Sequence, residues 1–213
     1  MPARVSEAIV LRTYPLREAD LVVSFFTRNQ GRLRGVAKRA KKPKSNFGSG
    51  LERLSHVEMS YYQRENRELV NLESCELIHS QFALAGEYDS SVALDFIAEL
   101  SEQLLPPAEP NEKFFRLLLS LLGYLRREGD GGVWCAVTYF SLWAVRLSGF
   151  LPDLKLSPEE AEIVKEMLQK PIEQMTARQW SKGTAAGLRR RLVHEVEQHI
   201  ERRLQTPAYL ESL

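Results

Sequence analysis

Alternating apolar and polar positions dominate the first 80 residues and predict β-strands. Residues 8–11 and 21–27 are apolar runs of good strand formers, and a turn signal follows each of them. Residues 56–63 alternate again, and residues 68–77 supply a further segment after a polar turn. Together with residues 32–38, these segments predict five short strands.

The segment 32–38 alternates in a way that separates charge from apolar surface. Leu33, Gly35 and Ala37 fall on one side, because successive side chains of a strand point to opposite faces. The other side carries Arg32, Arg34 and Lys38. The pattern predicts a half-buried strand with a charged outer face, followed by a loop over residues 40–50 that is rich in Lys, Ser and Gly.

Five short strands joined by tight links within about 80 residues fit a small closed Greek-key barrel. The oligonucleotide- and oligosaccharide-binding (OB) barrel is the main candidate. An SH3-like barrel is also compatible with the periodicity, which does not report the order in which strands pair.

From about residue 81 the apolar spacing becomes helical. The predicted helices run from Ser90 to the Pro106-Pro107 break, from Asn111 to Arg127, from Val133 to Leu147, from Ser157 onward and from Thr184 to Leu204. Ser90 and Asn111 stand where N-caps are expected, and Ser157 and Thr176 each begin a capping-box sequence. Residues 133–147 are apolar nearly all round, which predicts a central buried helix.

The two patterns meet near residue 80 and predict an α+β protein with two domains. Residues 1–80 are expected to form a five-stranded OB-fold barrel, and residues 81–213 an all-α helical domain. Neither an internal repeat nor a low-complexity tract is visible in the sequence.

Composition and cysteine spacing are those of an ordinary cytoplasmic protein, with 44% hydrophobic and 27% charged residues. The longest uncharged apolar stretch, residues 133–145, is shorter than the roughly 20 residues of a membrane crossing. Arg4 and Glu7 interrupt any apolar run that a secretory signal would need. Cys75 and Cys135 lie 60 residues apart without a CxxC pair, so neither a disulfide framework nor a zinc knuckle is indicated.

Charge is distributed very unevenly along the chain. Between Asp20 and Glu52 there is no acidic residue, and eight basic residues occupy that gap. The formal net charge is only +1, so the rest of the chain carries −7 (1 − 8). Positive charge concentrated in this way acts on a partner through its local field, and a polyanion such as nucleic acid is the partner it favours.

We predict a nucleic-acid-binding surface on this stretch, although a run of charges is more commonly a solvated loop. Phosphates would be bound by Arg32, Arg34, Lys38, Arg39, Lys41, Lys42 and Lys44. Phe47 and Tyr62 are candidates for stacking on bases, and the alternative for each is that it packs in the barrel. Tyr61 shares a face with apolar neighbours and is expected in the core. The strand cations should be held rigidly, and the loop cations should adjust to the bound strand.

No combination of residues argues for catalysis. His194 and His199 are five residues apart and project about 140° from each other on a helix, whereas an HExxH metal site needs both on one face. Acids at residues 159–160 stand in the first turn of a predicted helix, where they stabilise its dipole. His56 and His79 are isolated in the sequence and are interpreted as ordinary surface or barrel residues. We predict that the protein is not an enzyme and holds neither metal nor cofactor.

An ordered set of segments in this chain resembles a known family, the bacterial DNA repair and recombination mediator RecO. The matching segments are AIVL at 8–11, LVVSFFTRNQG at 21–31, GVAKRAKKPKSNFG at 35–48, SYYQRENRELVNLESCEL at 60–77, GFLPDL at 149–154 and HIERRLQTPAYL at 199–210. No single segment is diagnostic, but their order along most of the chain is fairly specific.

The resemblance implies an OB-fold head, a helical body and a non-enzymatic role in recombinational repair after DNA damage, in the RecFOR pathway and the SOS response. Such proteins bind single- and double-stranded DNA and anneal complementary strands. With RecR, and in many bacteria RecF, they load RecA onto strands coated by the single-strand-binding protein SSB. The acidic C-terminal tail of SSB binds their helical body. A cytoplasmic, nucleoid-associated location follows.

The chain departs from this family in one respect. Many members carry a four-cysteine zinc site after the segment that matches GFLPDL, whereas residues 155–184 contain no cysteine. We therefore expect no zinc in this chain.

Three other functions remain compatible with the residues themselves. An RNA-binding OB module of translation or RNA maturation would also need a basic groove. A nuclease would need clustered acids or a metal site, and an adaptor that binds only proteins would not need the cations.

Overall fold

The computed structural model describes residues 3–63, 68–151, 155–175 and 182–211. The chain divides into two compact units. The barrel unit consists of Met1–Ala83 with Leu105–Phe115, and the helical unit consists of Leu84–Leu104 with Arg116–Leu213. The predicted boundary near residue 80 concerns which parts of the chain fold independently, and it stays a prediction.

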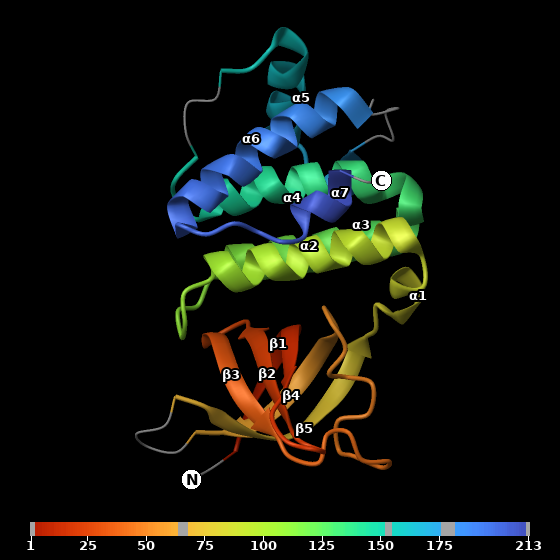
Figure 1. Ribbon diagram of the computed structural model, residues 1–213, viewed down its shortest axis with the longest axis vertical. Coiled ribbons are helices and arrows are strands. Elements are labelled where there is room, and N and C mark those ends of the chain that lie inside the picture. The colour runs from red at the N-terminus through yellow and green to blue at the C-terminus, as the bar shows by residue number, and fades with distance from the viewer. Residues whose placement is uncertain (1–2, 64–67, 152–154, 176–181, 212–213) are drawn as a thin grey trace. The chain divides into compact units, whose positions relative to one another are not determined.

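Five strands form a closed barrel, in the order β1-β2-β3-β5-β4 (Figure 1). The strands are β1 (Arg4–Pro15), β2 (Leu21–Thr27), β3 (Gly31–Ala37), β4 (His56–Tyr62) and β5 (Val70–His79). Strand β3 pairs in parallel with β5, and β1 pairs antiparallel with both β2 and β4, which closes the sheet. This confirms the predicted five-stranded OB-fold barrel.

The barrel core follows from period-2 alternation. Inward side chains come from every strand and include Ala8, Val10, Val23, Phe25, Ala37, Val57, Met59, Tyr61, Val70 and Leu72. Tyr61 is buried there, as predicted, and lies edge-on to Phe25. In β1 the register shifts between Val10 and Arg12, and a bulge of this kind bends a strand so that it can pair on both sides.

Gly35 lets β3 and β5 approach each other inside the barrel. A Cβ atom at this position would lie 2.8 Å from side-chain atoms of both Val70 and Leu72, closer than real Cβ contacts allow. The glycine therefore permits the parallel pairing of β3 with β5, and that pairing places the end of β3 beside the start of β5.

Helices make up the rest of the described chain. They are α1 (Phe82–Ala85), α2 (Tyr88–Leu104), α3 (Glu112–Glu128), α4 (Val133–Leu147), α5 (Pro158–Gln169), α6 (Lys182–Ile200) and α7 (Pro207–Glu211), with short 3₁₀ turns at Gly129–Gly132 and Ile172–Gln174. In the helical unit α4 packs between α2 and α6, and most of its side chains are buried (Figure 1). This confirms the predicted central helix.

Helix ends agree with the sequence signals in two cases and differ in one. Asn111 Oδ1 accepts a hydrogen bond from Phe114 N–H, and Ser157 forms the predicted capping box with Glu160. Ser90 does not cap α2, which already begins at Tyr88; its hydroxyl donates to Asp130 Oδ1 at 2.6 Å. The second capping box, at Thr176, lies outside the described residues.

Candidate nucleic-acid interface

The outer face of β3 carries basic side chains, as its alternation predicts. Arg34 and Lys38 are exposed, while Gly35 and Ala37 are buried on the opposite side. Lys38 directly follows the last residue of β3, so at about 3.3 Å per residue it is anchored roughly 13 Å from Arg34. This spacing lets the two side chains contact different phosphates of one extended strand.

Arg32 is less available than the other two strand cations. It is half-buried, and its Nε donates to the backbone oxygen of Leu105 at 2.7 Å. Residues 105–109 run along this part of β3, where Ala108 N–H donates to Arg32 O at 2.9 Å and Pro107 bridges to Arg32. The Arg32 guanidinium therefore helps to hold this segment in place, which makes Arg32 a weaker candidate for phosphate binding than Arg34 and Lys38.

A second aromatic and cationic cluster lies on the same outer face. In register across β1, β2 and β3, Arg12 is opposite Ser24 and Ser24 is opposite Arg34. Both guanidinium groups lie near the ring of Tyr14, with Cζ atoms 5.5 Å (Arg12) and 5.8 Å (Arg34) from its centroid. Tyr14 is half-buried. An aromatic ring beside two cations offers base stacking and phosphate attraction on one surface.

Sequence reasoning missed Arg12 and Tyr14 because they are remote from the basic stretch along the chain. Only the pairing register of β1 brings them beside Arg34, and the bulge after Val10 decides which face of β1 they occupy. The available signal was weak. It consisted of one arginine and one tyrosine two residues apart, which on a strand lie on the same face.

The basic loop, residues 38–50, is a chain of turns with many backbone hydrogen bonds. Lys42 N–H donates to Arg39 O, and Ser45 N–H donates to Lys42 O. Arg39 and Lys44 have positive φ angles of 56° and 62°, the left-handed conformation that ends such turns. Their side chains therefore leave the backbone in directions set by the turns.

Long-range hydrogen bonds anchor the loop at both ends. Near its start, the carboxylate of Asp20 accepts from Arg39 N–H at 2.8 Å. Near its end, Cys75 N–H donates to Asn46 O at 3.3 Å, and the Cys75 thiol donates to Phe47 O at 3.2 Å. Burial raises the pKa of this thiol to about 11, so it stays protonated and can donate. These bonds tie the loop backbone to the β1–β2 link and to β5, and the adjustment of its cations to a bound strand stays a prediction.

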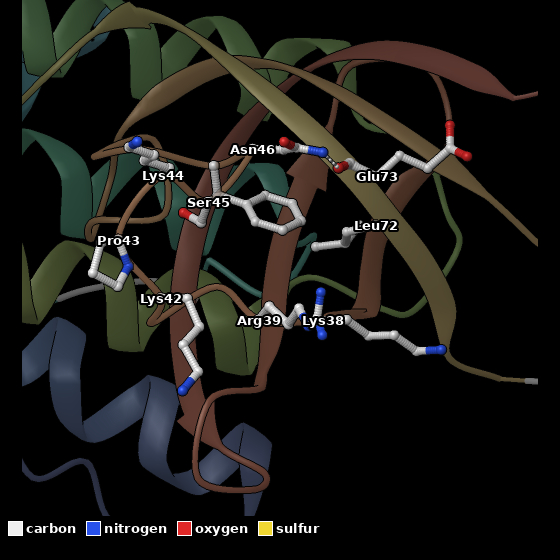
Figure 2. Close-up of a pocket in the computed structure, with 10 residues that line it drawn as sticks. Lys38, Arg39, Lys42, Pro43, Lys44, Ser45, Asn46, Leu72 and Glu73 are labelled. Atoms are coloured by element: carbon white, nitrogen blue, oxygen red, sulfur yellow. Dashed lines mark hydrogen bonds between the residues drawn. The ribbon is translucent and has the colours of Figure 1, made fainter.

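The basic loop and the start of β5 enclose a pocket of about 580 Å³ (Figure 2). Its lining combines four cations with apolar and neutral polar groups: Lys38, Arg39, Lys42, Pro43, Lys44, Ser45, Asn46, Phe47, Leu72 and Glu73. Glu73 is the one acid among these lining residues, and its carboxylate points away from the four cations in Figure 2. The lining therefore has a strongly positive local charge.

The four pocket cations make no ion pair with any residue that the structure describes. Elsewhere in the barrel unit, by contrast, Arg28 pairs with Glu7 at 2.9 Å and with Glu112 at 3.5 Å. Cations that no neighbouring acid neutralises keep their field for an external anion. This makes the pocket rim the strongest candidate for phosphate contacts.

The two predicted stacking residues are placed differently. Phe47 is only 4% exposed and belongs to the barrel core, so in this conformation its ring cannot be sandwiched against a strand on the open surface. Tyr62 is half-buried at the end of β4 and pairs with Asn71, which in turn pairs with Val36 on β3. Tyr62 therefore stays a candidate for stacking, two strands away from the charged face.

Comparisons with known proteins agree with this architecture. The family model described as "Recombination protein O N terminal" matches residues 1–81, and "Recombination protein O C terminal" matches residues 85–155. The DNA repair protein RecO of Koribacter versatilis is 40% identical, in an alignment that covers 98% of each chain. The chain belongs to the RecO family.

More distant RecO proteins match a smaller part of their own length. Those of Thermodesulfovibrio yellowstonii and Cutibacterium acnes are 33% and 31% identical. The alignments cover 70% and 72% of this chain but 59% and 64% of the relatives. All three of these relatives are DNA repair proteins, so the family resemblance inferred from the ordered segments is confirmed.

In this RecO protein, the cluster Arg189–Arg191 is held by acids of the helical unit. Arg189 is 2% exposed, stacks on Trp134 and lies 3.0 Å from the carboxylate of Glu211, which also binds Arg190. Arg191 pairs with Glu160. Hydrogen bonds from Arg190 and Arg189 lower the pKa of Glu211, against the opposing effect of burial. These arginines stabilise the helical unit, and their charges are largely compensated.

The two barrel histidines are not isolated. His56 Nδ1 lies 3.3 Å from His79 Nδ1 with the rings stacked, and His56 Nε2 lies 2.7 Å from the carboxylate of Glu7. Burial lowers the pKa of His56, while Glu7 acts in the opposite direction. The cluster connects β1, β4 and β5, so the two histidines are barrel residues that lie together in space although they are far apart in the sequence.

No group of three or more His, Cys, Asp or Glu side chains is arranged to hold a metal ion in the part of the chain that the structure describes. Across the same residues, no helix is long and apolar enough to cross a membrane.

Proposed function

We propose that this RecO protein binds single-stranded DNA along the outer face of β3 and over the basic loop. The observation that carries the proposal is the set of four pocket cations, which make no ion pair with the described residues. Arg34 continues the positive surface along the strand, and Arg12 and Tyr14 lie beside it. Membership of a DNA repair family makes DNA the natural polyanion.

Binding of this kind promotes the annealing of complementary strands. Two strands repel each other through their phosphates, and cations on one protein surface reduce that repulsion while the bases remain free to pair. Contacts to phosphates position a strand without reading its sequence, so annealing should depend little on base composition. The same cations should also bind the phosphates of double-stranded DNA.

The proposed partners follow from the family. We infer that the protein acts without enzymatic activity in the RecF pathway of recombinational repair. With RecR, and with RecF where it is present, it helps to load RecA onto SSB-coated strands. The acidic tail of SSB would be bound by the helical body. Family membership is what supports these partners.

A strand-annealing assay tests the proposal. Lys38, Arg39, Lys42 and Lys44 are replaced together by Glu, and pairing of two complementary oligomers is followed with and without SSB and RecR. The matched control replaces four exposed cations of the helical unit, Lys155, Lys165, Arg202 and Arg203, by Glu. This control changes the net charge by the same amount at a different place.

The pocket variant should anneal no faster than the oligomers do alone, and the control should retain annealing. Both should keep the circular dichroism spectrum of the native protein, because all the replaced side chains are exposed. Full annealing by the pocket variant would remove the proposal. Tighter binding of an RNA oligomer than of a DNA oligomer with the same sequence would favour the RNA-binding alternative.

A further inference from the structure

We infer that the pocket between the basic loop and β5 takes one unpaired base of the bound strand, and that this makes the surface selective for single-stranded DNA. The inference rests on the proposed function and deepens it. It assigns to Pro43, Ser45 and Leu72 a role in recognising the base, beside the phosphate contacts of the surrounding cations.

The composition of the pocket lining is the first argument. A site for phosphate alone needs only cations and N–H donors. This pocket adds apolar surface between its cations, mainly from the exposed Pro43, with the edges of the largely buried Phe47 and Leu72 at its floor. A flat aromatic base presents two apolar faces and a polar edge, and the sugar-phosphate attached to it carries the negative charge. The mixed lining matches that combination better than it matches a bare anion.

Polar groups of the lining suit the edge of a base. Ser45 and Asn46 both line the pocket, and the Asn46 side-chain amide donates to Glu73 O at 3.4 Å, which orients it along the start of β5 (Figure 2). The Asn46 carbonyl oxygen and the Ser45 hydroxyl can then exchange hydrogen bonds with a base edge. These groups tolerate several edges, so the pocket should show little base preference.

Size and rigidity are the second argument. The volume of about 580 Å³ falls within the roughly 300–1,000 Å³ of pockets that take small molecules. The hydrogen bonds from Arg39 to Asp20 and from Cys75 to Asn46 hold the loop on both sides of the pocket. When the pocket walls are already ordered before binding, the affinity is not reduced by the entropic cost of ordering them.

Strand selectivity follows from the geometry of nucleic acids. A base within a duplex is stacked and paired, and it reaches a pocket only if it is first rotated out of the helix. A base in a single strand is unpaired, so it can enter the pocket without the free-energy cost of breaking a base pair. A pocket that takes a base therefore favours single strands, whereas cations that bind phosphates do not, because each phosphate contact releases more counterion from a duplex than from a single strand.

The test compares probes with and without bases. The full-length protein is titrated with a thymidine 12-mer, with a 12-mer of abasic deoxyribose phosphates, and with a 12-base-pair duplex. The variant Ser45→Leu introduces bulk into the pocket without changing charge. The control Ser49→Leu makes the same substitution at an exposed residue of the same loop that does not line the pocket.

The native protein and Ser49→Leu should bind the thymidine oligomer about tenfold more tightly than the abasic one, within the range expected for a base stacked on side chains. In Ser45→Leu that ratio should fall at least about fivefold. Duplex affinity should stay the same in all three proteins, and this also shows that Ser45→Leu is folded.

Other results would overturn the inference in distinguishable ways. An equal loss for the thymidine and abasic oligomers in Ser45→Leu would mean that the pocket binds phosphate only. Unchanged oligomer affinities combined with weaker binding of an oligo-aspartate peptide would make it a site for acidic protein segments. If the native protein bound no oligomer in a salt-dependent manner, the proposed function itself would fail, and the pocket inference with it.

Discussion

Neutralising the four pocket cations should change the salt dependence of DNA binding by a predictable amount. The change replaces Lys38, Arg39, Lys42 and Lys44 by Gln, which removes four positive charges without adding a negative one. Each phosphate that a protein neutralises on a single strand contributes about −0.7 to the slope of log K against log salt concentration. If about five cations contact one strand, the native slope is roughly −3.5.

The quadruple variant should then have a slope of about −0.7, since it loses four contacts. If both proteins extrapolate to the same affinity at 1 M salt, the variant should bind the oligomer at 0.1 M salt about 2.8 powers of ten more weakly than the native protein does. Fluorescence anisotropy of a labelled thymidine oligomer at several salt concentrations measures both quantities. Arg39 and Lys44 have positive φ angles, and Gln tolerates that conformation about as well as they do, so the fold should not change.

A matched variant controls for net charge. Gln replaces Lys155, Lys165, Arg202 and Arg203, which are exposed on the helical unit. This variant should keep the native slope. A pocket variant that retained a slope near −3.5 would refute the reasoning, because the strand would then be bound by other cations.

Three further predictions concern other parts of the molecule. Tyr14→Ala should weaken single-strand binding by about 1–3 kcal/mol, whereas Tyr14→Phe should retain it, as measured by the same titration; equal losses would contradict a stacking role. Ser157→Ala removes the side-chain acceptor of the capping box and should lower the free energy of unfolding in urea by about 1 kcal/mol, and an unchanged midpoint would argue against the cap. The pKa of Glu211 lies below its ordinary value of 4.5, so its pairing with Arg190 adds stability above that pH that is lost as the pH falls through the lowered pKa. Thermal unfolding of Glu211→Gln should accordingly show a deficit at pH 7 that shrinks towards pH 3, and a pH-independent deficit would contradict it.

Strand positions and the charged face of β3 were predictable because they depend on local alternation. Strand β2 has the predicted bounds, and β3 and β4 differ by one residue at their ends. Gly35 and Ala37 are buried as their spacing requires. Strand β5 is shifted towards His79, since the first turn-type residue after Leu77 is Ser80.

What the sequence could not show depends on contacts between distant segments. Phe47 looks like an exposed aromatic residue in a polar loop, and it is buried because the loop is bonded to Cys75 on β5. Arg189 looks like part of a basic surface, and its partner Glu211 lies 22 residues further along the chain. Helical and strand periodicity carry no information about such partners.

The same limit applies to the candidate site. Seven cations could be identified from charge alone, but the structure was needed to divide them into a partly occupied Arg32, an exposed Arg34 and Lys41 outside the pocket, and four cations at the pocket rim. The arginine and tyrosine cluster on β1 depends on a bulge that shifts the register by one residue. A one-residue shift moves every following side chain to the other face of a strand, and periodicity alone does not locate it.

The most direct test of the central claim is to locate the bound strand. A thymidine oligomer that carries 4-thiothymidine is crosslinked to the full-length protein by light, and the attached peptides are identified by mass spectrometry. The account predicts crosslinks within residues 28–50, together with peptides that contain Tyr14. Crosslinks confined to residues 116–211 of the helical unit would contradict it.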